Sequence, residues 1–376
     1  MIESHLSLLL VVIPLLAAPV TAILPNGRLP WLLTLLVSWL CFAFAIWQFM
    51  LVMDGSVISY ELGGWAPPWG IEYRIDTVNA FVALIVTGMA AITLPYALRS
   101  VEQEIPEDKL SLFYATLLLC MDGLLGITLT GDIFNLFVFL EISSLSSYAL
   151  ISMGRQRRAL TAAYQYLIMG TIGATFLLIG IGLIYAETGT LNMMDLSSRL
   201  PAVFEHHTVH TAFAFIIVGV GLKLAMFPLH LWLPNAYTYA PSAVTVFLAA
   251  TATKVAVYVM LRLVFTVFSI SFAYVTPTND MFMLLGVLGV IVASVYAIKQ
   301  LDAKRLLAYS SVAQIGYILM GMGFASALGL TASVVHIFNH ALMKGALFMA
   351  VGALVYRIGY SQISQFKGLG RQMPWT

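Results

Sequence analysis

Long apolar runs separated by short polar segments make up most of the chain. Because a helix needs about 20 mainly apolar residues to cross a bilayer, the pattern predicts about eleven spans. These are expected near residues 6–24, 31–53, 76–98, 110–130, 133–152, 160–186, 211–232, 242–265, 281–298, 303–323 and 326–356. Turn-forming residues such as Pro25-Asn26-Gly27 separate the runs. We therefore expect an all-α fold, a polytopic transmembrane helix bundle.

Composition supports a membrane protein and excludes an ordinary soluble one. Hydrophobic residues make up 61% of the 376 residues, charged residues only 9%, and the mean hydropathy is +0.94. A soluble domain carries roughly 25% charged residues, so the lipid bilayer must surround most of this chain. The basic residues are scattered rather than clustered, which gives no indication of nucleic-acid binding. Cys41 and Cys120 have no metal-ligand spacing.

The distribution of basic residues between the loops predicts the orientation. With the N-terminus outside, twelve of the eighteen lie in inner loops, three in outer loops and three inside spans. The inner residues are Arg28, Arg99, Lys109, Arg155, Arg157, Arg158, Lys299, Lys304, Arg305, Arg357, Lys367 and Arg371, and the outer ones Arg74, Arg199 and Arg262. The positive-inside rule therefore predicts a cell (plasma or inner) membrane protein with a cytoplasmic C-terminus. It also favours one long helix, rather than two, over residues 242–277.

Ionisable residues inside the predicted spans are the candidates for function. A charge at the bilayer centre costs at least ~2.5–3.5 kcal/mol, so such residues are functional candidates by default. The set comprises Glu141, Lys223, Lys254, His336, His340 and Lys344. Any one of them alone could be a structural polar residue that pairs across a helix interface. Six together, including acid, base and imidazole, favour a proton-translocation path.

The last three of these residues share one helical face, because they are four positions apart. Successive members are about 6 Å apart along the axis. This gap suits a relay bridged by one or two waters. Zinc is the competing interpretation of two such histidines, but the sequence HIFNH lacks the glutamate of HExxH, and we expect no metal site.

Prolines near Lys223 predict a broken helix near 228–241. Pro228, Pro234 and Pro241 remove backbone donors and clash with the preceding turn. Interrupted helices at membrane depth mark ion sites in many transporters. The alternative is an unbroken helix that ends at Leu233. A Glu141–Lys223 pair would act as a proton switch if the two residues meet, and Asp122 is a further possible acidic step.

The chain resembles the antiporter-like subunits shared by respiratory complex I, membrane-bound hydrogenases and multisubunit monovalent cation/proton antiporters. The resemblance lies in GDIFNLFVFLEISSLSSYAL, TAAYQYLIMGTIGATFLLIGIGLIYAETGTLNM, KLAMFPLHLWLPNAYTYAPSAV, TKVAVYVMLR, DAKRLLAYSSVAQIGYILMG and HIFNHALMKGALF. The FNLFVFLE form is most similar to the D subunit of the cation/proton antiporters.

The resemblance implies roles for matched positions. It implies that Glu141 is the glutamate of the fifth helix and Lys223 the lysine of a broken seventh helix. Lys254 matches the eighth-helix relay residue, and His336, His340 and Lys344 match the eleventh-helix relay. In the WLPDAH stretch of the family this chain has Asn235 and Tyr237, which puts a proton-handling role there in doubt.

The resemblance also implies inverted five-helix repeats. We expect an N-terminal three-helix segment at 1–109, a first repeat forming a proton half-channel at 110–265, and an incomplete second repeat at 281–376. The family has about fourteen helices and a second key lysine on a broken twelfth helix, whereas this sequence stops at Thr376. We therefore expect a longer gene, or another polypeptide, to complete the path.

The expected function is proton translocation within a multisubunit Na⁺/K⁺–proton antiporter, in contact with other membrane subunits. A proton-pumping subunit of an NADH-quinone oxidoreductase or membrane-bound hydrogenase is the alternative within transport. A quinone-binding redox enzyme and a non-conducting scaffold are alternatives of other classes. No dinucleotide, phosphate-loop, haem or iron–sulfur motif occurs, so we expect no cofactor. An enzymatic role is expected only through a redox complex.

Overall fold

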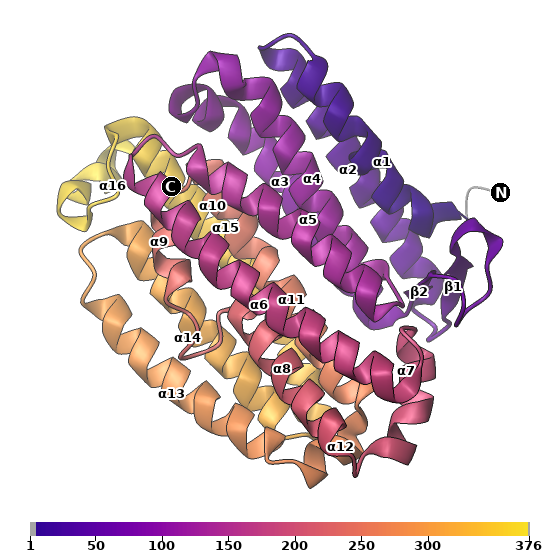
Figure 1. Cartoon of the computed structure of the whole chain (residues 1–376). Helices are drawn as coiled ribbons and strands as arrows, with labels where there is room; N and C mark the ends of the chain where they lie inside the picture. Colours follow the sequence, from indigo (N-terminus) through magenta and orange to yellow (C-terminus); the bar gives the residue numbers. More distant parts are fainter. Residues whose placement is uncertain (1–4, 375–376) are drawn as a thin grey trace.

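The computed structural model describes residues 5–374 as a bundle of long helices (Figure 1). Eleven helices within these residues are long and apolar enough to cross a membrane. They are α1 (Leu6–Ile23), α2 (Arg28–Val52), α3 (Thr77–Glu104), α4 (Leu110–Leu129), α5 (Ile133–Ser152), α6 (Arg158–Thr188), α8 (His207–Leu224), the span Ser242–Val267, α13 (Thr278–Ile298), α14 (Ala303–Gly323) and α15 (Ala327–Ile358). The predicted all-α bundle with eleven spans is confirmed.

Shorter elements join the spans. They are the helices α7 (Met193–Arg199), α9 (Trp232–Tyr239), α12 (Ser269–Val275) and α16 (Leu369–Gln372), and the strands β1 (Ile58–Glu61) and β2 (Glu72–Ile75). The strands pair antiparallel, with Ile58 opposite Ile75. This hairpin lies in the polar connector between the second and third spans, which the sequence pattern leaves without any secondary structure.

Aspartates at the helix starts explain several boundaries. The Asp76 carboxylate accepts hydrogen bonds from the backbone N–H groups of Val78 and Asn79 at the start of α3. Asp132 caps α5 and Asp302 caps α14 in the same way. Such side chains satisfy backbone donors that have no partner within the helix, so the polar separators fix where the spans begin.

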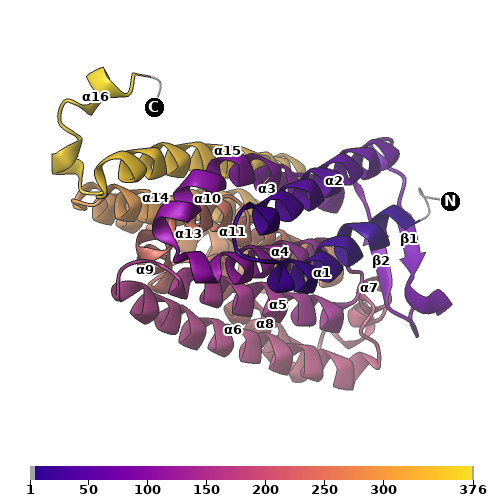
Figure 2. The same ribbon diagram turned by 90° about the horizontal axis from the view of Figure 1, so that it is seen from above.

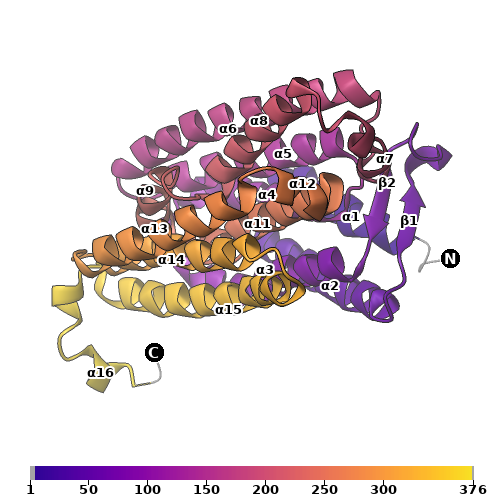
Figure 3. The same cartoon turned by 90° about the horizontal axis from the view of Figure 1, so that it is seen from below.

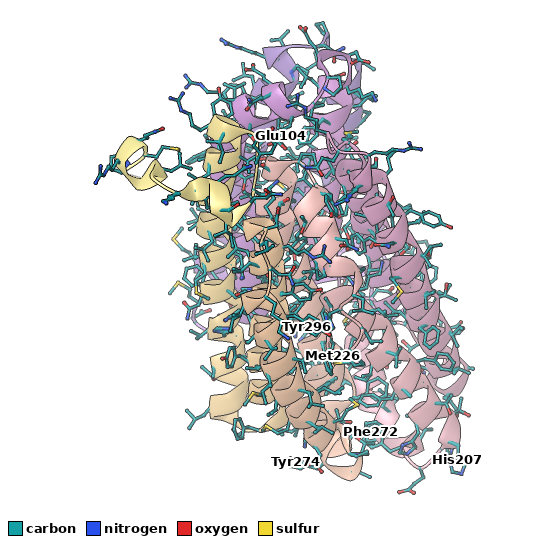
Figure 4. All side chains as sticks on the ribbon, turned by 90° about the vertical axis from the view of Figure 1, so that its left-hand side faces the viewer. Glu104, His207, Met226, Phe272, Tyr274 and Tyr296 are labelled. Carbon is teal, nitrogen blue, oxygen red and sulfur yellow. The ribbon has the colours of Figure 1, made fainter. Side chains whose placement is uncertain are left out.

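The two ends of the bundle can be told apart by labelled residues and by the termini. The chain begins at one end and its C-terminal segment leaves at the other (Figures 2 and 3), as an odd number of crossings requires. Figure 4 shows Glu104 near the C-terminal segment, with His207 and Tyr274 at the opposite end. Met226, which is buried, lies between the two ends, so the interruption after α8 is at an intermediate depth of the bundle.

Close contact between α6 and α8 depends on two glycines. A Cβ added to Gly219 would lie 2.6 Å from the carbonyl oxygen of Gly173, so a larger residue would push the helices apart. Small residues allow such close backbone approach in membrane bundles. This contact sets the position of α8, and therefore of Lys223.

The helix of Lys223 is broken, as predicted, but earlier than predicted. Helix α8 ends at Leu224, Ala225 has the left-handed φ of +60°, and residues 225–231 are not helical. Residues 232–239, inside the predicted break at 228–241, form α9. The ring of a proline clashes with the carbonyl four residues before it, which for Pro228 is that of Leu224. The alternative of an unbroken helix to Leu233 is wrong.

A second break, which no proline or glycine in the sequence indicates, lies inside the span Ser242–Val267. Helix α10 (Ser242–Ala250) and α11 (Ala252–Leu261) meet at Thr251, whose backbone φ of −123° and ψ of −59° are not helical. A π-helical turn, Arg262–Val267, completes the span. The whole still crosses once, as predicted, and 89% of its apolar window is buried.

Candidate functional site

Glu141 and Lys223 meet in the structure. The Lys223 Nζ lies 3.5 Å from the Glu141 Oε1. The side chain of Lys223 is 6% exposed and that of Glu141 is 23% exposed. The ammonium also donates to the Ser144 hydroxyl at 2.6 Å and to the Tyr148 hydroxyl at 3.4 Å. Helix α5 thus supplies every side-chain acceptor of Lys223 among the described residues, at positions 141, 144 and 148 of one helical face.

The helix break decides where Lys223 lies. The residue is in the last turn of α8 rather than in the middle of a helix, and a helix C-terminus favours a positive charge. The indole N–H of Trp232 donates to the carbonyl of Leu222 at 2.9 Å. The Trp232 ring stacks on Tyr166, with ring centroids 3.8 Å apart. These contacts hold the broken end against α6.

A small cavity lies between Lys223 and α11. Its volume is ≈ 30 Å³, and its lining includes Lys223, Ser144, Ser147 and Ala252. A cavity needs about 10–15 Å³ of this kind of volume to hold one water, together with polar partners. Lys223 and the two serines are such partners. The cavity therefore has room for a water on the side of Lys223 that faces the helix of Lys254.

Lys254 lies beside the second helix break and contacts the eleventh span. Its Nζ donates to the carbonyl of Ala249, which the break leaves without its usual helical partner, and lies 3.4 Å from the His340 Nε2. Both side chains are buried. Lys254 thereby caps the end of α10 and contacts a histidine 86 positions away in the chain.

The three relay candidates of α15 lie on one face of the helix, as the spacing predicts. The rings of His336 and His340 are 6.2 Å apart, and the His336 Nε2 lies 2.8 Å from the Gln314 Oε1. Lys344 donates to the carbonyl of Leu307 at 2.9 Å and to the Ser310 hydroxyl at 2.9 Å. Helix α14 therefore supplies the polar groups beside this face.

Lys304, which is predicted from the sequence to lie in an inner loop, is a buried cation. It is only 5% exposed. Its Nζ lies 3.3 Å from the carbonyl oxygen of Ala240 and 3.1 Å from the Ser242 hydroxyl. Glu104 accepts a hydrogen bond from the Ser242 N–H at 2.9 Å. The only sequence signal is the place of Lys304 two residues after Asp302, which caps the start of α14.

Other polar candidates lie apart from this chain of contacts. Asp122 is fully buried in α4, and neither carboxylate oxygen has a hydrogen-bond partner among residues 5–374. Asn235 donates to the Gln165 Oε1 at 2.8 Å, and the Tyr237 hydroxyl donates to the carbonyl of Leu248 at 3.2 Å. The histidines near position 206 lie at the end of the bundle opposite the C-terminal segment, where the His206 Nδ1 lies 2.8 Å from the Glu187 Oε2.

Comparison with known proteins identifies the family. Residues 130–376 match the family model described as "NADH:quinone oxidoreductase/Mrp antiporter, TM". The chain belongs to this family. A relative named "NADH-quinone oxidoreductase subunit N" from Desulforudis audaxviator is 40% identical over 376 residues, which cover 99% of this chain and 74% of the relative. The D subunit of a Na(+)/H(+) antiporter from Alkalihalophilus pseudofirmus is 29% identical over 324 residues, which cover 86% of this chain and 64% of the relative.

Two solved assemblies contain chains with the same fold. One is the membrane-bound sulfane sulfur reductase, an archaeal respiratory membrane complex, with a TM-score of 0.90 and 32% identity over 98% of this chain and 75% of that one. The other is the Mrp complex from Dietzia sp., with a TM-score of 0.90 and 30% identity over 99% of this chain and 68% of that one. The protein is thus an antiporter-like, multi-pass membrane subunit, as the resemblance implies.

In this antiporter-like subunit five of the six sequence candidates form two groups. Glu141 on α5 and Lys223 on α8 form the first group, and Lys254, His340 and His336 form the second. Lys344 lies on the same face of α15 but bonds to α14. The water-sized cavity belongs to the first group, because its lining includes Lys223 and Ser144 but no residue of the second group. Each group contains a lysine ammonium within 3.5 Å of another titratable side chain, which is close enough for a hydrogen bond between them.

Proposed function

We propose that this subunit translocates protons through the buried groups Glu141, Lys223, Lys254, His336, His340 and Lys344, within a multisubunit Na⁺ or K⁺/proton antiporter. The observation that carries the proposal is the buried Lys223–Glu141 pair at a helix break, with an N–O distance of 3.5 Å. Breaking such a pair leaves an uncompensated charge, which costs about 3–5 kcal/mol. A change in the separation of the pair therefore changes how strongly Lys223 holds its proton.

The second group provides a direct proton transfer. A lysine ammonium has three donors, and a neutral imidazole has one acceptor nitrogen. Transfer of a proton from the Lys254 Nζ to the His340 Nε2, 3.4 Å away, leaves a neutral amine and an imidazolium. The imidazolium would then pass a proton through a bridging water to the neutral ring of His336, whose centroid lies 6.2 Å away. A water in the cavity beside Lys223 would accept or donate a proton at the first group only.

The partners are other membrane subunits. Related chains are named as lettered subunits, and the two structural neighbours belong to multisubunit complexes. Helix α13 exposes Leu284, Leu288 and Ile291, which suit contact with lipid or with an apolar helix of a neighbour. We propose the orientation with the N-terminus outside and the C-terminus cytoplasmic, and the division into residues 1–109, 110–265 and 281–376.

A proton-pumping role in an NADH-quinone oxidoreductase is the second candidate function. The 40% identity to an N subunit of such a complex, against 29% to the antiporter D subunit, favours it. In that case electron transfer in another subunit drives the protons, and the same buried groups conduct them. The two functions differ in what starts proton movement, since a cation gradient drives one and a reductant drives the other.

Proton flux in vesicles that contain the full assembly tests both functions. The antiporter function requires a change in internal pH when Na⁺ or K⁺ is added, without any reductant. The redox function requires the change on addition of NADH with a quinone, and no response to the cations. Flux under neither condition, with the assembly intact, would contradict proton translocation itself. Glu141→Gln in the same vesicles tests whether the flux uses the proposed groups.

A further inference from the structure

A polar pocket of ≈ 520 Å³ opens at one end of the bundle. Its walls come from the end of α3, the connector between α5 and α6, α9, the connector between α13 and α14, and the segment after α15. Glu104, which lines it, marks this end in Figure 4, near the yellow C-terminal segment. Five segments that are far apart in the sequence thus converge where several spans end.

The pocket has an excess of positive charge. Five basic side chains line it, against two acidic ones, Glu104 and Asp302. The five are Arg155, Arg158, Lys299, Lys304 and Arg305. None of them has a carboxylate within 4.0 Å in the part of the chain that the structure describes. The positive-inside rule explains basic loops, but it does not require that they surround one pocket.

The two acidic residues are already used by the fold. Asp302 accepts hydrogen bonds from the Arg305 N–H at the start of α14 and from the Ser361 hydroxyl. Glu104 accepts from the Ser242 N–H at 2.9 Å and from the Ser100 hydroxyl at 3.1 Å. Both carboxylates thus have hydrogen-bond partners within the fold, and neither lies within 4.0 Å of a basic nitrogen of the pocket among residues 5–374.

Lys304 bonds within the protein, to Ala240 and Ser242, but most donors of the other four basic residues have no protein acceptor among the described residues. Arg158 donates to the Tyr239 hydroxyl at 3.3 Å. The Nε of Arg305 is buried and has no hydrogen-bond partner among residues 5–374. A buried donor without a partner costs about 1–3 kcal/mol. An anion that accepted a hydrogen bond from this donor would remove that cost.

We propose that this pocket binds the phosphate headgroup of an anionic phospholipid. Arginine pairs with phosphate through two parallel hydrogen bonds, and basic pockets between membrane helices bind anionic headgroups. The pocket lies at the level where the spans end, which is the headgroup region of a bilayer. Its rim includes Leu301 and Tyr360, which are 83% and 61% exposed and offer an apolar surface to the acyl chains. A free phosphate would not use these two residues.

A photoactivatable phosphatidylglycerol tests the proposal. The full assembly is reconstituted in phosphatidylcholine nanodiscs with a small fraction of the probe, and the labelled peptides are mapped by mass spectrometry. We expect labelling at the pocket-lining segments near 155–158 and 299–305. In Arg155→Gln with Lys299→Gln the labelling should fall about 25-fold, about fivefold for each charge removed. Neither residue belongs to the proposed proton path.

A matched control removes the same charges outside the pocket. Lys367→Gln with Arg371→Gln loses one lysine and one arginine from the segment after α15, neither of which lines the pocket. Its labelling should stay within twofold of that of the parent, and thermal melting of both doubles should match the parent's. Equal labelling of the two double variants would overturn the proposal. Displacement of the probe by inorganic phosphate alone would assign the pocket to a free anion. Cross-links to an acidic segment of another subunit, without labelling by lipid, would assign it to a protein partner. Either result would contradict the binding of a lipid headgroup.

Discussion

Replacement of Glu141 by glutamine is expected to lower proton translocation strongly while the protein still folds and assembles. Glutamine has nearly the shape of glutamate and keeps an oxygen that can accept from Lys223. The change therefore removes the negative charge and little else. The ammonium of Lys223 keeps its hydrogen bonds to Ser144 and Tyr148, at 2.6 and 3.4 Å, but loses the only carboxylate within 4.0 Å in residues 5–374.

The size of the effect follows from the distance between the charges. Two unit charges 3.5 Å apart attract with about 5 kcal/mol at an effective dielectric constant of 20. Because the Glu141 side chain is 23% exposed, solvent screening reduces this figure to about 2–3 kcal/mol. An energy of that size changes the ratio of charged to neutral lysine about 30- to 150-fold. If Lys223 must be protonated in each cycle, we expect the flux to fall by a similar factor.

The assay is proton flux into vesicles that contain the full assembly, followed with a pH-sensitive dye. Native gel electrophoresis of the same preparation checks that the variant assembles. Glu205→Gln is the matched control, because it makes the same chemical change at an exposed position outside the bundle core. Flux within threefold of the parent's in an assembled Glu141→Gln variant would refute the role of the ion pair.

Four further outcomes are expected. Lys223→Arg should lose translocation in the flux assay as fully as Lys223→Ala, because guanidinium does not release its proton in proteins; near-normal flux would show that Lys223 does not cycle. His340→Gln should lower the flux at least about tenfold with assembly intact, because an amide cannot accept the proton of Lys254, whereas His210→Gln should change nothing. Asp122→Ala should raise the free energy of unfolding by about 1–2 kcal/mol, since it removes a buried carboxyl group without a partner among the described residues, and a lower melting temperature would reveal such a partner. Cysteines placed in the loop 154–158 should be blocked by a membrane-impermeant reagent only from the cytoplasmic side, and labelling from outside would reverse the topology.

The number of spans could be predicted from the sequence because the bilayer imposes it. Backbone polar groups must be satisfied within each helix in lipid, so each apolar run of about 20 residues becomes one crossing. The helix interruption after Lys223 was also visible, through Pro228. The helix ends at Leu224 because the ring of Pro228 clashes with the carbonyl four residues earlier. The prediction of a break at 228–241 therefore began too late in the chain.

Other features leave no comparable trace in the sequence. The break at Thr251 has no proline or glycine beside it. The Thr251 hydroxyl donates to the carbonyl of Phe247 at 2.7 Å, a contact that bends helices, and Lys254 caps the freed carbonyl of Ala249. Threonine occurs in many unbroken helices, so only the tertiary structure distinguishes this one. The contact of Lys254 with His340 depends on the packing of two spans, and neither sequence periodicity nor spacing encodes it.

The two breaks place two lysines in similar but unequal environments. Each ammonium is at the C-terminal end of a helix, Lys223 in the last turn of α8 and Lys254 on the freed carbonyl of α10. Helix ends of this kind stabilise a cation by about 0.3–2 kcal/mol, which offsets part of the cost of burying the charge. Lys223 has a carboxylate as well, whereas Lys254 has only dipoles and His340 among the described residues. While Glu141 is close, we therefore expect a proton to reside on Lys223 in preference to Lys254. We expect movement of Glu141 away from Lys223 to remove that preference, so the separation of this one ion pair would control how strongly Lys223 competes for the proton.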